Sequence, residues 1–102
     1  MKIIELNIEM IRDLCKKYRV SRLFVFGSVL TDKFKPNSDI DFIVDFNEVG
    51  EIEYADNYFE LKEALENLFK RNVDLLEEKA IKNPYLRQSI DTSKKMIYGY
   101  WN

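Results

Sequence analysis

The chain has 102 residues, 46% of them hydrophobic and 33% charged, and a formal net charge of -2. This length allows one modest core, so we expect residues 1–102 to form a single domain. The sequence has no histidine, which excludes Ser-His-Asp and Cys-His nucleophiles and zinc sites built on histidine. A general base must therefore be a carboxylate, a lysine or a tyrosine, and a metal site must be rich in oxygen ligands.

The sequence also limits the compartment and the partners. No apolar run approaches the ~20 residues that span a bilayer, and no signal-peptide pattern is visible. The single cysteine, Cys15, excludes an internal disulfide and fits a reducing compartment. We therefore expect a cytoplasmic protein with no membrane partner, and the acidic net charge gives no reason to expect direct binding of nucleic acid.

The first half of the chain alternates helical and extended patterns. Asn7 is a candidate N-cap for an amphipathic helix whose apolar face is formed by Ile8, Ile11, Leu14, Cys15 and Tyr18. Residues 23–26 predict a buried strand that ends at Gly27, and residues 28–33 a short helix with Ser28 at or near its N-cap. Residues 33–38 read as a loop because Pro36 disfavours helix before it. Residues 39–46 alternate as a strand.

The second half continues this alternation. Residues 47–53 are polar and contain Gly50, which predicts a loop, and residues 54–70 predict a long helix. Residues 72–76 read as a third strand. Asn83 followed by Pro84 predicts the start of a last helix, with a loose apolar face of Tyr85, Leu86, Ile90, Ser93 and Ile97. This order predicts an α/β (α+β) layer domain with a short mixed sheet flanked by helices.

Two acids on alternate positions of the second predicted strand are the first candidate site. Asp39 and Asp41 share one strand face, about 6.6 Å apart along it. Their carboxylates could bind one metal ion, or two ions about 3.5–4 Å apart. The alternative is a turn acid beside Ser38 and a solvent-facing strand acid.

The turn at Gly27 and Ser28, separated from Asp39 by ten residues, is a candidate phosphate-binding site. Gly27 and Ser28 follow a strand and open a predicted helix, where backbone N–H groups can bind phosphate. Lys33 and Lys35, in the intervening loop, could supply counter-charge to a triphosphate or be simply solvated. Asp74 lies inside the apolar third strand. If that strand pairs beside the second, Asp74 could join the same cleft, complete a metal site and accept a proton from an attacking hydroxyl.

These motifs together resemble the minimal nucleotidyltransferase (MNT) family of the DNA polymerase β-like nucleotidyltransferase superfamily. The resemblance covers most of the chain and includes Gly27-Ser28, Asp39-Ile40-Asp41 and the later Val73-Asp74-Leu75-Leu76. It implies that Gly27 and Ser28 hold the nucleotide phosphates and that Asp39 and Asp41 bind Mg²⁺ (or Mn²⁺). It also implies that Asp74 activates or aligns an acceptor hydroxyl. The implied reaction transfers AMP from ATP and releases pyrophosphate.

The resemblance further implies a partner, since MNT proteins are commonly antitoxins of HEPN-domain ribonuclease toxins. Some of them silence the toxin by adenylylating a tyrosine. In many relatives the Gly-Ser turn continues as Ala-Arg-Gly, whereas this chain has Leu30, Thr31 and Asp32. Either Lys33 or Lys35 replaces the missing cation, or nucleotide binding is weak. Two further readings are therefore open: an antitoxin that acts by stoichiometric binding alone, and transfer to RNA or a small molecule.

Two groups of residues lie outside the predicted catalytic site. The first is basic and consists of Arg12, Lys16, Lys17, Arg19 and Arg22. It is either a solvated helix face or a surface for a partner or phosphate. The second is the aromatic group Tyr98, Tyr100 and Trp101, which is either an interface or a partly packed terminus.

Overall fold

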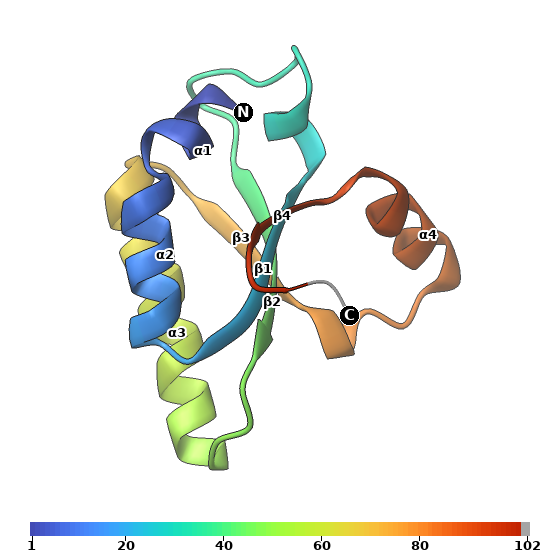
Figure 1. The fold of residues 1–102 in the computed structure, drawn as a ribbon. Coiled ribbons are helices and arrows are strands. Elements are labelled where there is room, and N and C mark those ends of the chain that lie inside the picture. Colours follow the sequence, from blue (N-terminus) through green and yellow to red (C-terminus); the bar gives the residue numbers. More distant parts are fainter. Residues whose placement is uncertain (101–102) are drawn as a thin grey trace.

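The computed structural model describes residues 1–100, so the prediction that Trp101 belongs to an interface lies outside the described residues. Helices cover both faces of a four-stranded sheet, with α1–α3 on one side and α4 on the other (Figure 1). The elements are α1 (Lys2–Leu6), α2 (Ile8–Lys17), β1 (Val20–Phe26), η1 (Gly27–Leu30), β2 (Ile40–Phe46), α3 (Glu51–Phe69), β3 (Val73–Glu77), η2 (Glu78–Ala80), α4 (Pro84–Ser93) and β4 (Lys95–Tyr98). The predicted α/β layer architecture is confirmed. No helix in this described range is long and apolar enough to cross a membrane.

The sheet is mixed and has the strand order β3-β2-β1-β4. Strand β1 is antiparallel to both β2 and β4, whereas β3 is parallel to β2. Parallel strands cannot be joined by a tight hairpin, and α3 provides the required crossover between β2 and β3. At the end of this crossover, the Glu66 carboxylate accepts a hydrogen bond from the backbone N–H of Val73 at 3.1 Å, which lowers the pKa of Glu66.

The face of the sheet beneath α1–α3 holds the main core. The predicted apolar stripes of α2 and α3 face it: Ile11, Cys15, Leu61 and Leu65 are fully buried. Alternate residues of the strands complete the cluster, namely Val20, Leu23, Val25, Ile40, Phe42, Val44, Val73, Leu75 and Ile97. The core is thus formed by the apolar faces of amphipathic helices on one side and by alternate residues of the strands on the other.

The opposite face has a much smaller core, formed by Phe24, Ile43 and Ile90. Asn83 caps α4 as predicted, because its side-chain oxygen accepts hydrogen bonds from the backbone N–H groups of Tyr85 (2.9 Å) and Leu86 (3.2 Å). The predicted apolar face of α4 is wrong for those two residues. Tyr85 is 83% exposed and Leu86 is 45% exposed, so α4 contacts the sheet mainly through Ile90.

The largest error of the sequence prediction is at the C-terminal end. The sequence pattern places Ile97 on the apolar face of the last helix, but residues 95–98 form β4, which pairs with the edge of β1. The helix ends at Ser93 because Lys94 is extended (ψ 147°). Its ammonium lies 2.9 Å from Asp91 and 4.4 Å from the centroid of the Phe24 ring. Pairing with β1 satisfies backbone groups that a free sheet edge would expose.

Three smaller differences concern element boundaries. Helix α1 was not predicted, because five residues are too few for a periodic pattern; it is anchored by the buried Ile4. Helix α3 begins at Glu51, three residues before the predicted start, so the preceding loop is shorter. The helix expected over residues 28–33 is the single 3-10 turn η1, preceded by Phe26 rather than capped by Ser28.

Candidate active site

Gly27 closes β1 and lies directly against one of the candidate acids. Its φ of +78° is in the left-handed region, where side chains are disfavoured. A Cβ atom at this position would overlap the carboxylate oxygen Oδ2 of Asp41. The turn therefore needs glycine for two reasons, and its backbone approaches the carboxylate closely.

The parallel pairing of β2 and β3 brings two candidate acids together. Asp41 and Asp74 are Cα partners in this register, next to the pair Ile40 and Val73. Val73 and Leu75 are buried in the main core, so by alternation Asp74 faces the α4 side of the sheet. Asp41 lies on the same side, because it alternates with the core residue Phe42. The pairing on which the role of Asp74 depended is thus present.

The acids around Asp41 make the end of this sheet face strongly negative. Asp41 is half-buried, and its pKa is raised, first by loss of hydration and then by the charges of Asp74 and Asp39. Asp39, Asp41 and Asp74 make no ion pair with any residue in the described range 1–100. A group of carboxylates without a cationic partner gains free energy when it binds a cation.

The donor set fits a hard divalent ion, although the side chains do not converge on one point. Among residues 1–100 there is no group of three or more acidic or sulfur side chains placed to hold a metal ion. Asp39 and Asp74 are exposed, whereas Asp41 is half-buried. Carboxylate oxygens are the ligands that Mg²⁺ and Mn²⁺ prefer.

The predicted phosphate-binding residues lie in the turn and loop beside these acids. Thr31 stabilises the turn by donating hydrogen bonds to the carbonyl of Ser28 from its backbone N–H and its hydroxyl, both at 2.9 Å. Lys33 and Lys35 are exposed, and neither side chain forms an ion pair with an acid within residues 1–100. Lys35 lines a separate pocket with Phe34 and Arg71. The structure thus brings Gly27 to Asp41 but leaves both lysines apart from the acids.

Arg71 is a residue of this region that the sequence did not reveal. One terminal nitrogen of its guanidinium donates hydrogen bonds to the carbonyls of Lys35 (3.1 Å) and Ser38 (3.0 Å). The guanidinium carbon lies 4.7 Å from the centroid of the Phe34 ring. These contacts fasten the loop that leads into Asp39 to the start of β3. The contacted groups are backbone carbonyls and a distant ring, so no spacing pattern could indicate them.

Comparison with known proteins identifies the class to which this arrangement belongs. Residues 8–97 match the family model of the nucleotidyltransferase domain, and the chain belongs to this family. It is therefore an enzyme, a nucleotidyltransferase, and a nucleotide is one of its substrates.

Individual relatives support the more specific prediction from the motifs, that the chain is a minimal nucleotidyltransferase. The chain is 39% identical over 83 residues to a Methanocaldococcus jannaschii protein named as a protein adenylyltransferase, covering 81% of this chain and 80% of the relative. It is 33% identical over 72 residues to the protein adenylyltransferase MntA of Thermococcus cleftensis, covering 71% and 70% of the two chains.

Solved structures give the same result for the fold. A structure described as a minimal nucleotidyltransferase superposes with a TM-score of 0.74 at 29% identity and covers 92% of each chain. A toxin-antitoxin structure with AMP-PNP superposes with a TM-score of 0.71 at 25% identity, covering 92% of this chain and 74% of the other.

Proposed function

We propose that this protein transfers AMP from ATP to a hydroxyl group of a HEPN-domain toxin and acts as that toxin's antitoxin. The observation that carries the proposal is the register that places Asp41 beside Asp74 and against Gly27. Relatives named as protein adenylyltransferases and similar toxin-antitoxin structures support the choice of acceptor.

The residues divide the chemistry among them. Asp39 and Asp41 would hold Mg²⁺ (Mn²⁺ has the same ligand preference), with Asp74 as a further ligand or as the base. When bound, the ion would supply positive charge beside the phosphates and the leaving group. Backbone N–H groups at Gly27 and Ser28 hold the phosphates beyond the α-phosphate, and Lys33 and Lys35 supply counter-charge from the loop.

The transfer is an in-line displacement. The acceptor oxygen forms a bond to the α-phosphorus while the bond from that phosphorus to the bridging oxygen breaks, and pyrophosphate leaves. Asp74 takes the proton of the attacking hydroxyl. A carboxylate in this role agrees with a chain that has no histidine.

A mass measurement on the partner tests the proposal. The partner is the HEPN-domain protein that co-purifies with this chain after expression from its own gene neighbourhood. Incubation with ATP and Mg²⁺ should add the mass of AMP to it. Asp41→Asn should slow this addition about 10³-fold, since a bound metal contributes several kcal/mol to the transition state. Asp32→Asn is the matched control, because Asp32 is an exposed acid in the loop before β2, and it should keep the wild-type rate. An unchanged rate in Asp41→Asn would overturn the mechanism.

A second function, inhibition by binding alone, is favoured by one specific observation. Residues 30–32 lack the basic residue of many relatives, and the lysines that could replace it are not in contact with the acids. In this case toxin neutralisation in cells would survive the double change Asp39→Asn/Asp41→Asn. Loss of neutralisation with intact toxin binding would exclude it.

A further inference from the structure

A pocket of about 690 Å³ lies at the end of the sheet away from the acids. Val20 and Ser21, at the start of β1, line it, whereas Gly27 follows the end of the same strand. Val20 and Phe26 are six steps apart along the extended strand, a distance of about 20 Å. The pocket is therefore distinct from the candidate active site, and its volume is typical of small-ligand sites.

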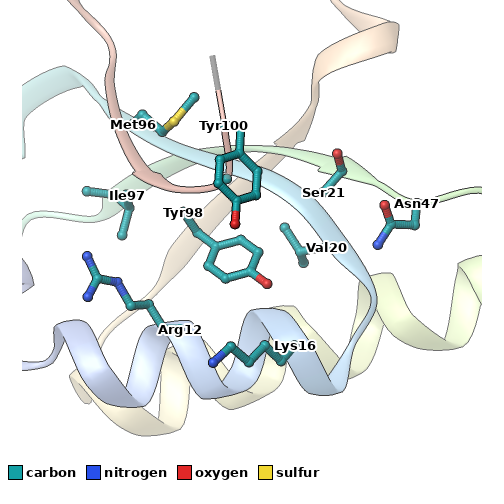
Figure 2. Close-up of a pocket in the computed structure, with 10 residues that line it drawn as sticks. Arg12, Lys16, Val20, Ser21, Asn47, Met96, Ile97, Tyr98 and Tyr100 are labelled. Atoms are coloured by element: carbon teal, nitrogen blue, oxygen red, sulfur yellow. The ribbon is translucent and has the colours of Figure 1, made fainter. Parts of the chain in front are cut away.

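The pocket brings together members of the basic group and of the aromatic group, which have no role in the catalytic hypothesis. Figure 2 shows Arg12 and Lys16 rising from α2 on one side, and the rings of Tyr98 and Tyr100 on the side of the C-terminal strand. Arg12 and Lys16 are four residues apart, so they project from the same helix face. Two cations and two aromatic rings that are distant in sequence thus line one cavity.

The charge of this pocket is uncompensated. No acidic residue is among its described lining residues. Arg12 and Lys16 make no ion pair within residues 1–100, whereas the neighbouring Arg22 is paired with Asp45 at 2.9 Å. Two unpaired like charges on one helix face repel each other mildly, and an anion between them removes this cost.

The remaining lining groups define the shape of the ligand. Ser21, Asn47 and the two tyrosines present hydroxyl and amide groups that can donate hydrogen bonds to an anion. Tyr98 packs against the main core and is held in place, whereas Tyr100 is 85% exposed and free to cover a planar group. Cations beside aromatic rings are the combination that binds a phosphate joined to a base.

We infer that this pocket is a second nucleotide site, in which Arg12 and Lys16 bind the phosphates and Tyr100 stacks on the base. It needs no divalent metal, because the protein itself supplies the positive charge. The inference does not depend on the proposed adenylyl transfer.

Calorimetric titration of the purified protein with ADP in EDTA tests the inference. Chelation keeps nucleotide from the acidic end, where uncompensated carboxylates repel phosphate. We expect one ADP per chain, with an affinity that falls as salt is added. Arg12→Gln/Lys16→Gln should weaken binding about 100-fold, roughly tenfold for each charged contact. The matched control Lys2→Gln/Lys82→Gln removes two exposed lysines outside the pocket and should leave binding unchanged.

One further variant makes the outcome decisive. Tyr100→Ala should weaken ADP binding about tenfold without affecting pyrophosphate. The inference is overturned if ADP does not bind in EDTA, or if Arg12→Gln/Lys16→Gln binds it as the wild type does. Equal affinity of the wild-type protein for pyrophosphate and ADP would also overturn it, since the base would then contribute nothing.

Discussion

The two faces of the sheet are built on different principles. Helices α1–α3 cover one face with a continuous apolar core, whereas the face toward α4 buries only Phe24, Ile43 and Ile90. The acids Asp41 and Asp74 lie on this thinly covered face. Apolar burial on one face thus supplies most of the stability, and it allows the other face to hold charges that oppose folding.

The largest effect on stability should come from the well-covered face. Leu61→Ala removes a fully buried side chain of α3 and should lower the free energy of unfolding by about 3 kcal/mol. Nucleotidyl transfer by the fraction that remains folded at low temperature should continue at the wild-type rate. Urea titration measures the first effect. Leu6→Ala is the control, because Leu6 is 74% exposed and should change stability by less than about 0.5 kcal/mol.

Gly27→Ala should affect both stability and chemistry, unlike a core change. The positive φ alone should cost about 1–2 kcal/mol, and the overlap with the Asp41 carboxylate adds to this. Transfer activity should fall because the carboxylate must move. Gly50→Ala is the matched control, since a Cβ there meets nothing within 4 Å. If thermal unfolding found the two variants equally stable, the close approach at Gly27 would be refuted.

Arg71→Ala tests the junction between the two faces. Phe34, beneath the guanidinium, packs on the main core, and Ser38 leads directly into Asp39. Losing the two hydrogen bonds and the ring contact should cost about 1 kcal/mol of stability and roughly tenfold in transfer rate. Arg71→Lys keeps the charge but not the planar fork, so it should fall between wild type and Arg71→Ala. A fully active Arg71→Ala would show that the loop needs no such anchor.

Asp41→Asn should have a small effect on stability, opposite in sign to that of Leu61→Ala. The pKa of Asp41 is raised in the folded state, so the folded protein binds this proton more tightly than the unfolded chain. Wild-type stability should therefore decline as the pH rises from the unfolded-state pKa of an aspartate through the raised folded-state pKa. Asp41→Asn removes this decline and should be the more stable protein at neutral pH. Denaturant titrations across this range test the prediction, and Mg²⁺ should raise the melting temperature of the wild type more than that of the variant.

Much of the architecture follows from periodicity. The apolar stripes of α2 and α3 and the alternation along β2 predicted which residues face the main core, because long amphipathic patterns allow few other arrangements. The spacing from Gly27 to Asp41 and the isolated acid Asp74 predicted the family, which is confirmed. The individual roles of the acids, lysines and metal remain predictions.

The parts that were missed depend on contacts distant in sequence. Residues 95–98 became a strand because β1 offered a free edge, although Met96-Ile97-Tyr98 before Gly99 was a strand-like signal that helical spacing obscured. The pocket at the opposite end required α2 and β4 to lie side by side, so Arg12 and Tyr98 could not be connected before β4 was known. Arg71 donates its hydrogen bonds to backbone carbonyls, and every residue has a backbone carbonyl, so the sequence does not indicate which ones are contacted.

The pairing of Asp41 with Asp74 has a consequence for how this sequence tolerates insertions. Val73 and Leu75 fix which side of β3 faces the core, and Asp74 takes the opposite side by alternation. Adding one residue between Leu75 and Glu77 would leave Asp74 in place, whereas adding one between Val73 and Asp74 would turn it into the apolar layer. The two lengthened proteins would have the same composition, yet only the first would keep the acids together. The buried side chains of Val73 and Leu75 thus determine that Asp74 lies on the charged face of the sheet.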